Sequence, residues 1–74
     1  MKQIEPLLLS VSQTALLLGI GRRTLYGLIA AGKLPPSFLL GGRRIFRRSD
    51  LETWIDLGMP PLERFLVLTK GGRG

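Results

Sequence analysis

The chain has 74 residues with no cysteine and no histidine, and its 11 lysines and arginines outnumber 5 acidic residues for a formal net charge of +6. A chain of this length forms one domain that buries only about 60% of its unfolded surface, which leaves little room for a deep catalytic cavity. Without Cys and His, disulfides, thiolate metal sites and the commonest general base are excluded, so we expect no enzyme, no cofactor and no metal site.

The first predicted helix begins at a capping box. Ser10 precedes Gln13 by three residues, the spacing at which each side chain bonds the backbone amide of the other. We expect this helix to run from Val11 to Leu18 and to end at Gly19. Val11, Ala15 and Leu18 should face the core, and the leucines at 16 and 17 widen the apolar stripe beyond what one buried face needs.

A second helix should follow after the tight turn Gly19-Ile20-Gly21. We expect it from Arg22 to about Ala31, with Gly32 as the left-handed cap. Its apolar side would carry Leu25, Leu28 and Ile29, and its other side Arg22, Arg23, Tyr26, Gly27 and Ala30. Gly21 at the N-cap leaves the first amides open to an anion such as a phosphate. Two helices joined by a three-residue turn have the helix-turn-helix spacing, although a helical hairpin without a ligand would have it too.

A glycine inside this second helix, Gly27, costs about 0.5–1 kcal/mol relative to alanine. The cost predicts a close approach at this point, either to the first helix or to a DNA backbone.

A β-hairpin is predicted around Gly41-Gly42, because two glycines favour a type I′ turn. The turn would pair Leu40 with Arg43, Leu39 with Arg44, and Phe38 with Ile45. In that register Phe38 and Ile45 seal the core, whereas the placement of Phe46 stays open. The hairpin carries Arg43 and Arg44 at its tip and Arg47 and Arg48 at its base. It is either a wing that grips phosphates or the minor groove, or a solvated basic hairpin.

A third helix is predicted from Asp50 to about Leu57, started by a second capping box, Ser49 with Glu52. Leu51, Trp54 and Ile55 would face inward, and Asp50, Glu52 and Asp56 outward. After the break at Gly58, the segment from Leu62 to Thr69 fits a helix or a strand, and residues 70–74 should be disordered. We therefore divide the chain into a DNA-binding domain, 7–57, and a C-terminal extension, 58–74.

The fold class is then mostly α with a small β-hairpin: a winged helix-turn-helix of three short helices and a two-stranded antiparallel wing. The order of motifs resembles the excisionase/AlpA-like family of small winged helix-turn-helix proteins, which are related to MerR-type regulators. The runs R-R-T-L-Y, G-K-L-P, G-G-R-R and R-R-S-D-L-E-T-W carry this resemblance, which covers about residues 7–57. Gly21 and Gly27 depart from it, since serine and a long basic side chain are common at those positions.

The resemblance implies a small transcriptional regulator or a recombination directionality factor (excisionase) that binds double-stranded DNA and recruits an integrase or recombinase. The residues predicted to contact DNA are Arg22, Arg23, Thr24, Tyr26, Lys33, Arg43, Arg44, Arg47 and Arg48. We expect several copies to bind adjacent sites, with self-association through the segment from Leu62 to Leu68. No stretch approaches the ~20 apolar residues of a membrane span, so we expect a cytoplasmic protein without a membrane partner.

Two other classes remain open at this point. A protein-interaction adaptor would use the same domain to recruit a recombinase or polymerase, with only minor DNA contact. RNA binding is less favoured, because the exposed stacking aromatics of RNA-binding sheets are absent.

Overall fold

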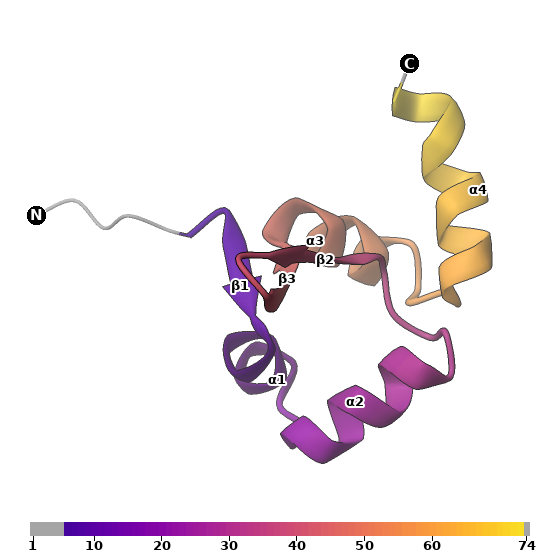
Figure 1. The fold of residues 1–74 in the computed structure, drawn as a ribbon. Coiled ribbons are helices and arrows are strands. Elements are labelled where there is room, and N and C mark those ends of the chain that lie inside the picture. Colours follow the sequence, from indigo (N-terminus) through magenta and orange to yellow (C-terminus); the bar gives the residue numbers. More distant parts are fainter. Residues whose placement is uncertain (1–5, 74) are drawn as a thin grey trace, which may run out of the picture.

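The computed structural model describes residues 6–73, and of residues 70–73 it describes the backbone alone. Four helices surround a small antiparallel sheet in this part of the chain (Figure 1). In chain order the elements are β1 (Leu8–Ser10), α1 (Val11–Leu18), α2 (Arg22–Ala30), β2 (Ser37–Leu40), β3 (Arg43–Arg47), α3 (Arg48–Asp56) and α4 (Leu62–Arg73). The mostly helical winged helix-turn-helix class is confirmed, and β1 and α4 are additions to it.

The sheet has three strands in the order β1-β3-β2, and both pairings are antiparallel. The predicted hairpin register is confirmed, with Phe38 opposite Ile45 and Leu40 opposite Arg43. Gly41 and Gly42 have φ of 60° and 80°, as a type I′ turn requires. The two-stranded wing was incomplete, because β1 adds a third strand in which Leu9 lies opposite Phe46.

The helix-turn-helix begins as predicted. The Ser10 hydroxyl accepts from the Gln13 amide at 3.1 Å, and the Gln13 side chain accepts from the Ser10 amide at 2.9 Å. Gly19 ends α1 in the left-handed conformation with φ 75°. Gly32, with φ 69°, follows the end of α2 in the same way. Left-handed backbone favours glycine, so both helix ends are set locally.

Helix α3 starts earlier than predicted, because β3 runs into it without a loop. Its N-cap is Arg47 and it makes no side-chain capping bond, so the capping box of Ser49 with Glu52 does not form. Instead the Arg47 guanidinium donates two hydrogen bonds to Asp50, at 2.9 and 3.1 Å, across the first turn. Asp50 is buried by this contact, so its predicted outward position was wrong.

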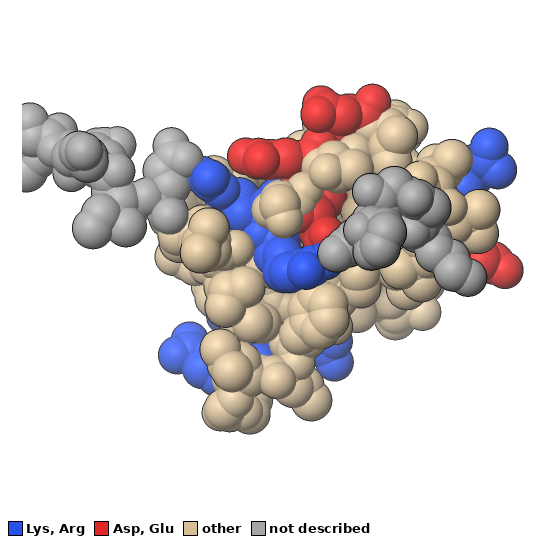
Figure 2. Space-filling model, turned by 90° about the horizontal axis from the view of Figure 1, so that it is seen from above, with Lys and Arg blue, Asp and Glu red and all other residues tan. Residues whose placement is uncertain are grey.

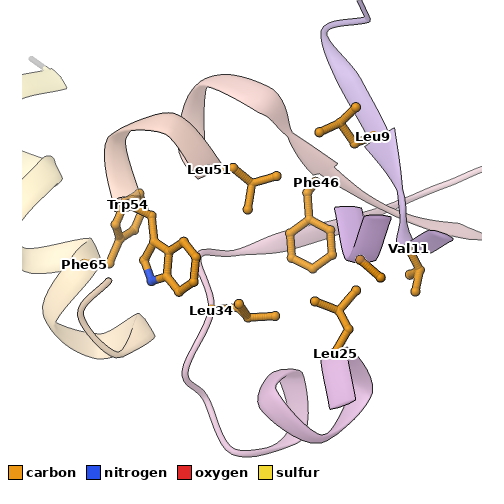
Figure 3. Close-up of a cluster of buried hydrophobic side chains, with 9 residues drawn as sticks. Leu9, Val11, Leu25, Leu34, Phe46, Leu51, Trp54 and Phe65 are labelled. Atoms are coloured by element: carbon orange, nitrogen blue, oxygen red, sulfur yellow. The ribbon is translucent and has the colours of Figure 1, made fainter. Parts of the chain in front are cut away.

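The core lies between the sheet and the helices, and Phe46 is at its centre (Figure 3). Its buried apolar residues come from every element except β2, together with the loop after α2: Leu9, Val11, Ala15, Leu25, Leu34, Phe46, Leu51, Trp54 and Phe65. Trp54 anchors α3 there, and its indole N–H donates to the Pro60 carbonyl at 2.9 Å. Buried tryptophan N–H groups need such a partner.

Two expectations about the core were wrong. Phe46 is fully buried, whereas Phe38 is 44% exposed and Ile45 only half-buried. Since adjacent strand residues point to opposite faces, burying Phe46 turns Ile45 and its cross-strand partner Phe38 away from the core. Ile55 was expected to face inward but is 47% exposed. Helix α1 buries Thr14 alongside Val11 and Ala15, and the half-buried Leu18 packs against the core on the predicted face.

The segment after Gly58 forms helix α4, which resolves the choice between helix and strand. Phe65 of α4 enters the core, and the Leu62 amide donates to the Gly32 carbonyl at 2.8 Å. The helical backbone continues to Arg73. The disorder predicted for residues 70–74 stays a prediction, because the side chains of residues 70–73 and all of Gly74 lie outside the described part of the chain. Among the described elements, no helix has both the length and the apolar character needed to span a bilayer.

Candidate nucleic-acid interface

The helix-turn-helix unit is held by backbone bonds in its turn and by one buried leucine. The Ile20 amide donates to the Ala15 carbonyl at 3.0 Å, which closes the end of α1. The Leu25 amide donates to the Gly21 carbonyl at 3.0 Å and starts α2. Leu25 is fully buried against the sheet, beside Phe46 (Figure 3). The opposite side of α2 must therefore face outward.

The exposed surface of α2 carries the predicted contact residues. Arg22, Arg23, Thr24 and Tyr26 are all exposed, and Tyr26 keeps 52% of its surface. At 100° per residue, Arg23 points almost directly away from the core, because it lies two residues before Leu25. The Arg22 guanidinium donates to the Ser12 hydroxyl of α1 at 3.5 Å, which directs it along the junction of the two helices.

The start of α2 has the properties of a phosphate contact. Gly21 at the N-cap is extended and offers no side-chain acceptor to the first amides. These amides and the positive end of the helix dipole favour an anion, and two arginines follow immediately. A DNA phosphate at this point would also fix how deeply α2 enters a groove.

Gly27 lies on the outward side of α2, in open space. A Cβ built on it meets no atom within 4 Å, so the predicted close approach to α1 was wrong. The alternative that was predicted for Gly27, a close approach to a DNA backbone, stays a prediction.

Replacing Gly27 by alanine tests this. The free protein should gain about 0.5–1 kcal/mol in its free energy of unfolding, because alanine is the better helix former and nothing clashes with it. Chemical denaturation would measure this gain in stability. The DNA affinity of the same variant would show whether DNA approaches α2 at this position. A more stable protein with weaker DNA binding is expected if the DNA comes close here, and unchanged binding would remove the prediction.

The wing arginines divide between the two faces of the hairpin. Phe46 points from β3 toward α2 (Figure 3), so Arg44, two residues earlier, leaves the strand on the same face. Arg44 is half-buried, and its guanidinium donates to the Ser37 hydroxyl on the neighbouring strand. Arg43 is exposed next to the turn and leaves from the other face. Arg44 is thus the wing arginine on the side of α2.

Arg47 and Arg48, also predicted to contact DNA, have carboxylate partners on α3 instead. Arg47 bonds Asp50 and lies over the Phe38 ring, with its guanidinium carbon 5.6 Å from the ring centroid. The hydrogen bond to Asp50 raises the pKa of the Arg47 guanidinium, and the negative charge of Asp50 adds to this effect. The Arg48 guanidinium is 3.8 Å from Glu52. The structure therefore does not bring these two arginines together with Arg22, Arg23 and Arg44.

The acidic side chains belong mostly to α3, and Glu63 stands in the first turn of α4, where the Leu62 amide bonds the Gly32 carbonyl beside the end of α2. Figure 2 shows the molecule from above, with carboxylates and Lys and Arg side chains next to one another on this face. In the described part of the chain they belong to α3 and α4 alone: Asp50, Glu52, Asp56 and Glu63. Helix α2 has no acidic residue, and Lys33 follows its C-terminal end in an exposed position. Helix α2 is therefore cationic along its own length.

Two hydroxyl groups that orient these arginines were not identified from the sequence. Ser12 accepts from Arg22 and Ser37 accepts from Arg44. Each pair links two elements that are separate in sequence, so no local pattern could reveal it. Within residues 6–73, no group of three His, Cys, Asp or Glu side chains is placed to hold a metal ion.

Comparison with known proteins agrees with this geometry. The family model described as helix-turn-helix domain matches residues 8–56, from the start of β1 to the end of α3. No curated protein matches the chain significantly. No solved structure does so either. The family match covers well over half of the 74 residues and contains the α1–turn–α2 unit. The chain therefore belongs to the helix-turn-helix domain family.

Proposed function

We propose that this protein binds double-stranded DNA sequence-specifically, with α2 in the major groove. One observation carries the proposal: α2 buries Leu25 against the core and leaves Arg22, Arg23, Thr24 and Tyr26 exposed at its N-terminal end. The second helix of a helix-turn-helix reads base edges with its N-terminal residues, where these four side chains stand. The family match supports DNA as the partner.

Each exposed residue of α2 has a distinct role in this proposal. Arg23 points most directly outward, so it is the candidate for bidentate contact with guanine. Arg22 is directed toward α1 by Ser12 and suits a phosphate beside the groove. Tyr26 is one residue beyond Leu25 and lies at the side of the helix, within reach of a phosphate or a thymine methyl group. Thr24 lies at the opposite side.

The wing would hold the DNA next to the site read by α2. Arg44 lies on the face of the hairpin toward α2, and Arg43 extends from the turn. Both suit phosphate contacts or the narrow minor groove. Arg47 and Arg48 are engaged with α3, so we assign them no leading role in the contact.

Within this function, the protein acts in the cytoplasm as a small transcriptional regulator or as a recombination directionality factor that works with an integrase. The order of the arginine, glycine and S-D-L-x-x-W motifs supports this role through the resemblance to the excisionase/AlpA-like family. No catalytic step is part of the proposal. The second candidate, an adaptor for a recombinase, is favoured by one observation: Leu16 and Leu17 on α1 are 80% and 65% exposed.

Replacing Arg23 by alanine tests the assignment of α2. A preferred site is first selected from random duplexes with the wild-type protein, and its affinity is then compared with that of single-base variants. The change should cost about 1–3 kcal/mol on the preferred site and relax the preference at one position, because a base contact is lost. An equal loss on all sequences would show that Arg23 contacts only phosphate.

Arg64→Ala is the matched control. It removes the same charge from an exposed arginine on α4, so it should leave the base preference unchanged. If the wild-type protein selects no sequence and binds no duplex, the DNA-binding proposal fails and the adaptor function becomes the favoured one.

A further inference from the structure

Helix α4 lies outside the residues matched by the family model, 8–56, yet it is bonded to the end of α2. The Leu62 amide, at the first residue of α4, donates to the Gly32 carbonyl at 2.8 Å. Gly32 is the left-handed residue that follows the end of α2. Figure 1 shows the start of α4 above this end of α2. The C-terminal extension therefore touches the helix that is proposed to read DNA.

The buried side of α4 strengthens this attachment. Phe65 is 2% exposed and belongs to the same buried cluster as Leu34, in the loop after α2, and Trp54 on α3. Leu62 is half-buried. It lies three residues before Phe65, so both side chains are on one face of α4. The first turn of α4 thus combines a backbone bond to the end of α2 with an apolar anchor in the core.

The segment that leads into α4 is also held in place. The Met59 amide donates to the Trp54 carbonyl at 2.8 Å, and the Trp54 indole N–H donates to the Pro60 carbonyl at 2.9 Å. Met59 has φ 59°, a left-handed conformation that favours glycine. Another residue keeps such a conformation only where the surrounding structure holds it. The start of α4 is therefore fixed to α3 and can serve as a support.

Helix α2 needs a second support because little of it is buried. Of its nine residues, all of them described, only Leu25 is buried, while Leu28 and Ile29 are half-buried. Gly32 lies seven residues after Leu25. At about 1.5 Å per residue, the two points are about 10 Å apart along the axis. A helix anchored at one point can tilt about it, whereas a helix held at two separated points has a fixed direction.

We propose that α4 positions α2 for reading DNA, with Leu62 and Phe65 as the positioning residues. Arg22 and Arg23 are at the other end of α2, so a tilt about Leu25 displaces them from the bases. Base contacts require precise geometry, whereas contacts to phosphate carry no sequence information. The inference rests on the proposed DNA binding, and it extends the DNA-reading unit beyond the family domain to Phe65.

The rest of α4 has no part in this support. Leu66 and Val67 are 46% and 69% exposed, and Leu68 and Thr69 line an open cleft of about 660 Å³ between α4 and α3. Changes on this part of the helix should leave DNA binding by a single copy unchanged. The self-association predicted for the segment 62–68 stays a prediction.

Two substitutions at one position isolate the bond to α2. Leu62→Pro removes the amide that donates to Gly32, and proline is well tolerated at the first position of a helix. Leu62→Ala removes the side chain but keeps the amide, so it is the matched control. Fluorescence anisotropy on duplexes of about 15 base pairs, long enough for one copy, compares the preferred site with a single-base variant of it.

The ratio of the two affinities is the informative quantity. It should fall about two- to tenfold in Leu62→Pro, because a positioning bond transmits no more than the free energy of one hydrogen bond. Leu62→Ala should keep the wild-type ratio. A variant that is only less stable loses affinity for both duplexes equally, so the ratio separates positioning from stability. A wild-type ratio in Leu62→Pro would overturn the positioning role.

A second pair of variants tests the apolar anchor. Phe65→Leu keeps the bond from Leu62 and shortens the buried contact, so it should lower the same ratio by a smaller factor. Val67→Ala is its matched control on the exposed side of α4 and should keep the ratio. If Leu62→Pro does not fold, this pair decides: equal ratios in Phe65→Leu and Val67→Ala would contradict the proposal.

Hydrogen exchange of the free protein tests the support without DNA. The Gly32 and Lys33 amides close the end of α2 by donating to the Ile29 and Leu28 carbonyls. They should exchange about two- to tenfold faster in Leu62→Pro than in Leu62→Ala, while amides within α1 keep their rates. Unchanged exchange at these two amides would show that α4 does not support α2. A wild-type protein that binds neither duplex overturns the proposed function instead, and the exchange result still tests the support of α2.

Discussion

Replacing Phe46 by alanine should lower the free energy of unfolding by about 3–5 kcal/mol, the usual cost of removing a buried aromatic ring. Phe46 is fully buried at the centre of the core, between Leu9 on the neighbouring strand and Leu25 on α2. A domain of this size has roughly 4–11 kcal/mol in total, so the variant should be largely destabilised. Urea denaturation followed by circular dichroism measures the loss.

Phe38→Ala is the matched control, because it removes the same ring from the neighbouring strand of the hairpin. Phe38 is 44% exposed, and its interaction with Arg47 is a partly solvated cation–π contact. Its loss should cost about 1 kcal/mol. Equal costs for the two variants, or a larger cost at Phe38, would contradict the face assignment of β3 and with it the position of Arg44.

The affinity for DNA should fall about 500-fold when monovalent salt rises from about 50 to about 200 mM. This follows if roughly five phosphates are neutralised, since each contributes about −0.9 to the log–log slope for a slope near −4.5. Arg22, Arg43 and Arg44 are the leading candidates for these contacts, together with the open amides at the start of α2. Titration of a fluorescent duplex at several salt concentrations measures the slope.

Charge-removing variants locate the phosphate contacts. Arg43→Gln and Arg44→Gln should each reduce the magnitude of the slope by about 1 if they contact phosphate. Arg64→Gln removes the same charge from α4 and should leave the slope unchanged. An affinity that does not respond to salt would show that the cationic side of the protein does not bind the DNA backbone.

Much of the architecture could be predicted from local patterns. Ser10 and Gln13 start α1, Gly19 ends it, and Gly41-Gly42 determine the hairpin register. Each of these features involves residues at most a few positions apart. Their energetics come from backbone bonds and φ preferences that do not depend on distant parts of the chain.

The wrong predictions share a different cause. The short strand β1 has three residues and forms because β3 offers it an edge, which no local pattern in Leu8–Ser10 signals. The pairing of β1 with β3 and the packing of the helices against the sheet place Phe46 in the core instead of Phe38. Asp50 was assigned to the outer face of α3 with Glu52 and Asp56, whereas its carboxylate bonds Arg47 across the start of the helix.

For the candidate interface, the division is similar. Helix periodicity alone places Arg23 opposite Leu25 and Thr24 and Tyr26 at the sides of α2, because that relation depends only on 100° per residue. Which wing arginine shares their side depends on which face of β3 is buried, and Phe46 decides this through contacts with α2 and β1. Local chemistry thus determines the elements and their boundaries, whereas the burial of side chains distant in sequence determines which residues remain exposed to bind a partner.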